Sequence, residues 1–125
     1  MTRGEFIRAL EQGGITFSYS ERGERIVIAE ENYYFKSGDL GITSIPPNVT
    51  FENSGTIRLD EISQLPEGII FNNYGGIYAE GVTRIPTGTK FGRSVKAVLL
   101  AGGTIDFGIR EINYGDLLTA VFKYS

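Results

Sequence analysis

The chain repeats itself with a period of 20 residues. Three consecutive blocks begin at Ile45, Leu65 and Ile85 and read IPPNVTFENSGTIRLDEISQ, LPEGIIFNNYGGIYAEGVTR and IPTGTKFGRSVKAVLLAGGT. Each block opens with an aliphatic residue and a proline, and Ile105 stands where a fourth block would begin. A repeat of this length cannot bury its own apolar side, so it must stack on its neighbours. The period therefore predicts a repeat architecture in which equivalent positions lie in columns.

Alternation of apolar and polar residues within each block predicts two short strands per coil. The first strand points residues such as Phe51 inward, and the second does the same with Ile57. In the third block, the 20-residue spacing assigns Ala97 and Leu99 to the interior. We expect equivalent strands to pair in parallel about 4.8 Å apart. Stacking then predicts two ladders, one of phenylalanines (Phe51, Phe71, Phe91) and one of asparagines (Asn53, Asn73).

One corner of each coil carries a turn signal. Proline follows the opening aliphatic residue, and Asn48, Gly68 or Gly88 stands two positions later. Proline fixes φ near −65°, whereas glycine and asparagine tolerate positive φ. These positions are interpreted as structural.

The flanking segments predict caps for the two open ends of the stack. Thr2 and Glu5 have the spacing of a helix capping box, and alternating residues after Gly14 predict a β-hairpin, so residues 1–30 form a helix-plus-hairpin cap. Residues 31–104 hold the solenoid repeats. Residues 105–125 are expected to close the stack as a β-hairpin, with a helix from Asp116 to Phe122 as the alternative.

The resulting fold class is mainly β. We expect residues 1–125 to form a single domain, a short capped β-solenoid of about three to four 20-residue coils with an N-terminal helix-plus-hairpin cap and a C-terminal β-hairpin cap.

Composition excludes several function classes. The chain has neither cysteine nor histidine, which removes thiolate catalysis, most hydrolase triads and the commonest metal ligands. Its formal net charge of −3 does not suggest the basic surface that binds duplex nucleic acid. No signal peptide or membrane-spanning run is evident, so the expected location is the cytoplasm, or the host cytoplasm for a phage-encoded protein. No cofactor and no metal are expected.

Carboxylates are the remaining candidates for acid–base chemistry. Asp60 and Glu80 occupy the same repeat position and would lie one coil apart. Stacked carboxylates can raise one another's pKa, as in a general acid. We interpret both as solvated side chains beside a turn, and we expect no enzymatic activity.

The unit Leu-Pro-x-Gly-apolar-x-Phe, clearest at Leu65–Phe71, resembles small solenoid-repeat proteins of bacteria, phages and prophages. The resemblance covers roughly residues 1–104. The Leu-Pro pair is more distantly similar to the leucine-rich repeats of bacterial effectors, but the asparagine that follows the strand in those repeats is missing after Leu59. Neither resemblance carries over a catalytic residue, and the missing asparagine favours a straighter β-solenoid over a horseshoe.

Binding is therefore the favoured function class. The outward positions of the strands and bends mix aromatic, cationic and aliphatic residues, as protein interfaces do. The predicted partner-binding residues are Arg58, Ile70, Tyr74, Tyr78, Lys90 and Lys96, which were expected to share one flat face.

Three functional hypotheses follow. The preferred one is a non-enzymatic module that binds another protein, specifically a phage- or prophage-encoded inhibitor or adaptor of a host defence enzyme. The second is a structural subunit that assembles into a homo-oligomer or virion. The third is a carbohydrate-binding module in which Tyr34, Tyr74 and Tyr78 stack on sugar rings.

Overall fold

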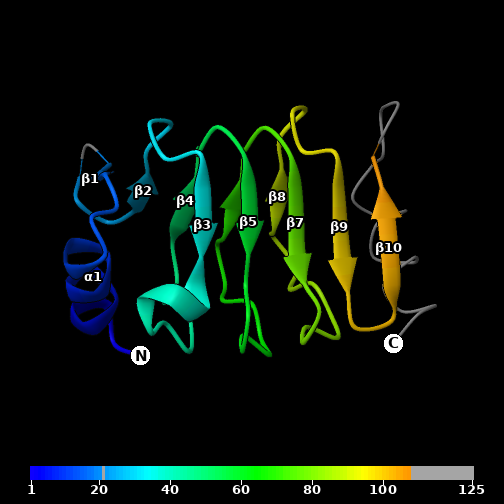
Figure 1. Ribbon diagram of the computed structural model, residues 1–125, viewed down its shortest axis with the longest axis horizontal. Coiled ribbons are helices and arrows are strands. Elements are labelled where there is room, and N and C mark those ends of the chain that lie inside the picture. The colour runs from blue at the N-terminus through cyan, green and yellow to red at the C-terminus, as the bar shows by residue number, and fades with distance from the viewer. Residues whose placement is uncertain (21, 108–125) are drawn as a thin grey trace.

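The computed structural model of the protein describes residues 1–20 and 22–107. Within that range one helix precedes a series of short strands wound into successive coils (Figure 1). The elements are α1 (Arg3–Gln12), β1 (Phe17–Tyr19), β2 (Ile26–Ile28), β3 (Tyr34–Lys36), the 3₁₀ turn η1 (Ser37–Leu40), β4 (Val49–Phe51), β5 (Thr56–Arg58), β6 (Ile70–Phe71), β7 (Gly76–Ala79), β8 (Lys90–Phe91), β9 (Ala97–Leu100) and β10 (Gly103–Asp106).

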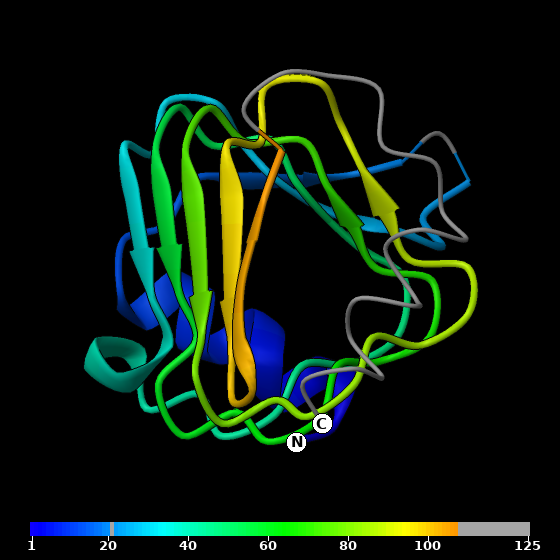
Figure 2. The same ribbon diagram turned by 90° about the vertical axis from the view of Figure 1, so that its right-hand side faces the viewer.

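The strands form two sheets, one from each half of the coil. Sheet A has the order β1-β2-β4-β6-β8, and sheet B has the order β10-β9-β7-β5-β3. All pairs between successive coils are parallel, whereas β1–β2 and β9–β10 are antiparallel. Viewed down the long axis, the sheets form separate walls and irregular segments close each coil (Figure 2). The expected β-solenoid of about four coils is confirmed.

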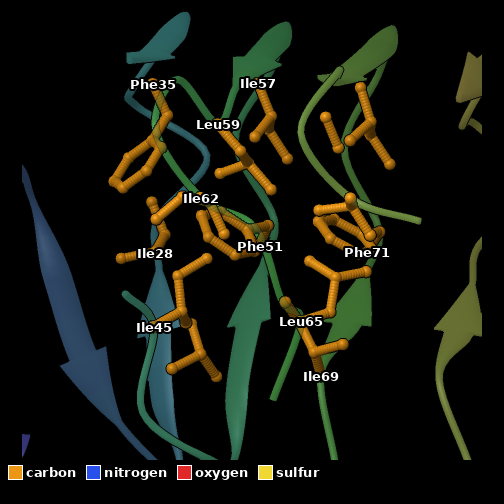
Figure 3. Close-up of a cluster of buried hydrophobic side chains, with 14 of the residues drawn as sticks. Ile28, Phe35, Ile45, Phe51, Ile57, Leu59, Ile62, Leu65, Ile69 and Phe71 are labelled. Carbon is orange, nitrogen blue, oxygen red and sulfur yellow. The ribbon is translucent and has the colours of Figure 1, made fainter. Parts of the chain in front are cut away.

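A ladder of phenylalanine rings runs through the interior. The rings of Phe51, Phe71 and Phe91 stack at centroid distances of 5.5 Å, with interplanar angles of 12° and 18°. Phe35 meets Phe51 edge-on at one end, and Phe107 packs on Phe91 at the other. Isoleucines and leucines of both sheets surround the rings (Figure 3). The predicted aromatic ladder is confirmed and extends beyond the repeats.

The predicted corner turn is also present. Asn48, Gly68 and Gly88 have φ of 63°, 71° and 92°, which lie in the left-handed region that asparagine and glycine tolerate. A Cβ at Gly68 would lie 2.4 Å from Oδ1 of Asn48 in the preceding coil. The opening residues of the blocks, such as Ile45 and Leu65, are buried beside this turn.

A second corner is held by asparagines. Asn53 and Asn73 are both 0% exposed, and both side-chain amides donate to the carbonyl oxygen of Gly55, at 3.1 and 2.9 Å. Since Gly55 belongs to the coil of Asn53, the Asn73 bond joins two coils. The asparagine ladder is confirmed as a chain of side-chain to backbone bonds.

The N-terminal cap has the expected helix and hairpin. Glu5 N–H donates to Thr2 Oγ1 at 3.1 Å, and Thr2 N–H donates to Glu5 Oε1 at 2.9 Å, which completes the capping box. Phe6 and Leu10 are fully buried at the end of the core, and Arg3 donates to the carbonyls of the β1–β2 turn. No helix among the described residues is long and apolar enough to cross a bilayer.

The third coil departs from the 20-residue spacing. Ile77 pairs in register with Val98, so the interval from the ladder phenylalanine to the second strand is one residue longer than in the preceding coil. Val98 and Leu100 are therefore buried, and the assignment of Ala97 and Leu99 to the interior was wrong. One inserted residue reverses the faces because strand side chains alternate.

The C-terminal hairpin also starts earlier than expected. β9 and β10 form it, with Ile105 opposite Val98, so Ile105 does not open a fourth repeat and the hairpin overlaps the predicted repeat region. The rest of the predicted C-terminal hairpin, from residue 108 onward, and the alternative helix from Asp116 to Phe122 lie outside the described residues.

Removing a ring from the centre of the phenylalanine ladder should leave a cavity and lower the free energy of unfolding substantially. Because Phe71 is 1% exposed and has a ring on either side, Phe71→Ala should lower the free energy of unfolding by about 3–5 kcal/mol in urea titration. Tyr74→Ala, at a residue 62% exposed, is the control and should cost less than about 1 kcal/mol. Equal losses would contradict the ladder.

The capping box predicts a pH-dependent contribution from Glu5. The Thr2 backbone N–H bond lowers the Glu5 pKa below its ordinary value, and the Thr2 side chain adds to this effect. Since the folded pKa is depressed, the stability difference between wild type and Glu5→Gln should be present at neutral pH and vanish as pH falls through the folded pKa. NMR titration of the Glu5 carboxyl measures the pKa, and Glu11→Gln controls for charge loss. An unshifted Glu5 pKa would exclude the effect.

Candidate functional site

The six predicted partner-binding residues do not share one face. Arg58 and Tyr78 lie on sheet B, and Lys96 directly precedes its strand β9, whereas Ile70 and Lys90 lie on sheet A. Tyr74 occupies the bend between the sheets and is 62% exposed. The expectation of a single flat face was wrong, because the chain turns a corner between the two strands of each coil (Figure 2).

Sheet B presents two rows of outward residues. Its alternate positions, such as Ile57 and Val98, are buried, so the residues between them point outward. We call these residues the sheet-B face. Register places Lys36, Arg58, Tyr78, Leu99 and Thr104 in one row and Tyr34, Thr56, Gly76, Ala97 and Asp106 in the other.

The centre of the sheet-B face is a cation–π pair. The guanidinium carbon of Arg58 lies 4.6 Å from the centroid of the Tyr78 ring, on the next strand in register. Gly76 lies beside this ring, and a Cβ at Gly76 would contact Tyr78 Cε2 at 3.5 Å. The contact fixes a planar cation on an otherwise flat surface.

A second cation adjoins this pair. Lys36 on β3 is the register partner of Arg58 on β5. Its ammonium lies 3.7 Å from Asp39 Oδ1, and the side chains are 37% and 68% exposed, which makes this a weak surface pair. In the described part of the chain, Arg58 has no carboxylate partner. Two cations therefore stand side by side at the N-terminal half of the sheet-B face.

The outward row of sheet A is more enclosed. Arg25 Nη1 donates to Thr50 Oγ1 at 3.2 Å and to the Gly68 carbonyl at 2.7 Å, so its side chain crosses this side and Thr50 is buried. Ile70 is half-buried beside Thr50, and Lys90 is exposed. Sequence analysis missed Arg25, whose partners lie 25 and 43 residues away.

Exposed tyrosines mark the bend and the edge of sheet B. Tyr33 is 79% exposed and Tyr34 is 46% exposed, and Tyr74 projects from the same bend two coils further on. The carbonyl of Tyr33 would lie 2.1 Å from a Cβ at Gly55, which explains glycine there.

The two candidate acid–base residues, Asp60 and Glu80, differ in their exposure to solvent. Ser37 Oγ donates to the Asp60 carbonyl at 2.8 Å, and Asp60 Oδ2 is buried beside Gly38, whereas Glu80 is exposed. Among residues 1–20 and 22–107, no group of three or more acidic, histidine or cysteine side chains is arranged to hold a metal ion.

Comparison of the chain with protein-family models, curated proteins and solved structures found no match.

The register of the third coil yields a direct test of the sheet-B face. Val98→Lys should cost about 3–5 kcal/mol, because it places an unpaired charge in the core. Leu99→Lys should change the free energy of unfolding by less than about 1 kcal/mol, because this side chain points outward. Urea unfolding of both variants measures their free energies of unfolding. A larger loss in Leu99→Lys than in Val98→Lys would show that Leu99 points inward, as the unbroken 20-residue spacing predicts.

Proposed function

We propose that the protein is a non-enzymatic module that binds another protein through the sheet-B face. The observation that carries the proposal is the Arg58–Tyr78 pair at the centre of that face. Tyrosine and arginine dominate the binding energy of protein interfaces, and a contact that fixes both before binding lowers the entropy lost on association. Leu99 and Ala97 add apolar surface along the same rows.

Several features support binding over catalysis. The sequence lacks histidine and cysteine, and the carboxylates of Asp60 and Glu80 lie at the strand ends rather than on the sheet-B face. Strand pairing makes this face a continuous surface across five strands, with parallel pairs from β3 to β9 and the antiparallel pair β9–β10 at the edge. Rigid, flat surfaces suit docking of a partner.

The specific form of the proposal comes from the sequence resemblance. We propose a phage- or prophage-encoded inhibitor or adaptor that acts on a host defence enzyme in the cytoplasm, with a structural subunit of a virion or homo-oligomer as the alternative. A carbohydrate-binding role draws support from the exposed rings of Tyr34 and Tyr74. Tyr78 lies two strands from Tyr34 on the sheet-B face, in the other row.

Affinity capture tests the binding face. Tagged protein is incubated with lysate of the organism that encodes it, and the captured partner is quantified for wild type, Tyr78→Ala and Tyr19→Ala. Tyr78→Ala should reduce capture about tenfold or more. Tyr19→Ala is the matched control, because Tyr19 also lies near an arginine, with Arg3 5.9 Å from its centroid, but belongs to the N-terminal cap. It should leave capture unchanged.

Other results would redirect the proposal. Capture that survives Tyr78→Ala but is lost in Lys90→Glu would move the site to sheet A. A defined oligomer in light scattering, without a captured partner, would favour the structural subunit. Glycan binding that is lost in Tyr74→Ala would favour the carbohydrate-binding module.

A further inference from the structure

Two cations, Lys36 and Arg58, are neighbours on the sheet-B face, and in the described part of the chain only Lys36 has an ion-pair partner. Lys36 and Arg58 are register partners on strands about 4.8 Å apart, and like charges at such positions destabilise a sheet. The 3.7 Å pair with Asp39 offsets Lys36 only weakly. Arg58 has an aromatic neighbour but no carboxylate in the described part of the chain. An anion at this place would therefore relieve a repulsion built into the free protein.

The geometry of Arg58 suits a carboxylate. The guanidinium carbon of Arg58 lies over the Tyr78 ring, 4.6 Å from its centroid, and a cation–π contact of this kind does not use the N–H donors of the guanidinium. A planar guanidinium binds carboxylate through two parallel hydrogen bonds, and little side-chain entropy is lost when it is already fixed. The guanidinium of Arg58 makes no hydrogen bond to a described residue.

We infer that the segment of the partner that docks on the sheet-B face is an acidic peptide, with a carboxylate seated between Lys36 and Arg58 and apolar side chains on Tyr78 and Leu99. This inference rests on the proposed function. Charge complementarity at this place supports it, because Lys36 and Arg58 are both cationic and are register partners, although the formal net charge of the whole chain is −3.

A peptide-display selection tests the inference with defined probes. Random peptides of about 12 residues, long enough to cross the five strands when extended, are selected on the immobilised full chain at low salt. Peptides enriched on wild type should carry an excess of Asp and Glu. Their affinity should fall about tenfold or more in Arg58→Gln and in Tyr78→Ala. Arg84→Gln, a matched change at an exposed arginine between β7 and β8, should leave affinity within about twofold.

A charge-reversed variant provides the complementary selection. Lys36→Glu combined with Arg58→Glu should select basic peptides in place of acidic ones. The urea midpoint of free Arg58→Gln should change little, because the substitution removes both a like-charge neighbour of Lys36 and a weak surface cation–π contact with Tyr78; a large fall would indicate that Arg58 serves the fold.

The outcomes separate the inference from the proposed function. Enriched peptides that depend on Tyr78 but are not acidic, or that bind Arg58→Gln as well as wild type, would overturn the acidic partner and leave the binding face in place. Enriched peptides that do not depend on Tyr78, or no enrichment at all, would overturn the binding face itself.

Discussion

Parallel pairing in register between successive coils is the constraint on which the rest of the structure depends. Strands β6 and β8 have two residues each and would not be stable alone. Their position is fixed because Phe71 lies between Phe51 and Phe91, both in the hydrogen-bonded sheet and in the ring stack. Each coil buries its apolar surface against its neighbours. The first and last coils have a neighbour on one side only, so caps are needed to cover their other side.

The repeat made the columns of the solenoid predictable, but it could not locate the inserted residue in the third coil. Strand β9 reads Ala97-Val98-Leu99-Leu100, and all four residues are apolar, so alternation does not distinguish the inward pair from the outward pair. Only the pairing of Ile77 with Val98 settles the faces. The early hairpin at β10 has a similar cause, because Ile105 satisfies the repeat pattern as well as it satisfies an antiparallel strand.

The sequence predicted which residues of the candidate site are neighbours on adjacent strands, but it did not predict which residues share one sheet. A 20-residue offset placed Arg58 beside Tyr78, as observed. The angle between the sheets is set at the corners held by Asn53 and Asn73, and periodicity carries no information about it. For this reason Ile70 and Lys90 were grouped with the residues of the other sheet. The proposed role in binding an acidic segment follows from the corrected face, where the cations lie on β3 and β5 and the apolar residues lie on β9.

The most direct measurement of the central claim is urea unfolding of a variant in which residues 65–84 are duplicated after Arg84. If coils stack as equivalent rungs, the added coil should extend both sheets and the phenylalanine ladder, and the protein should unfold cooperatively with an increased m-value and an undiminished midpoint. An unchanged m-value, or loss of the cooperative transition, would show that the coils are not interchangeable rungs and would contradict the account.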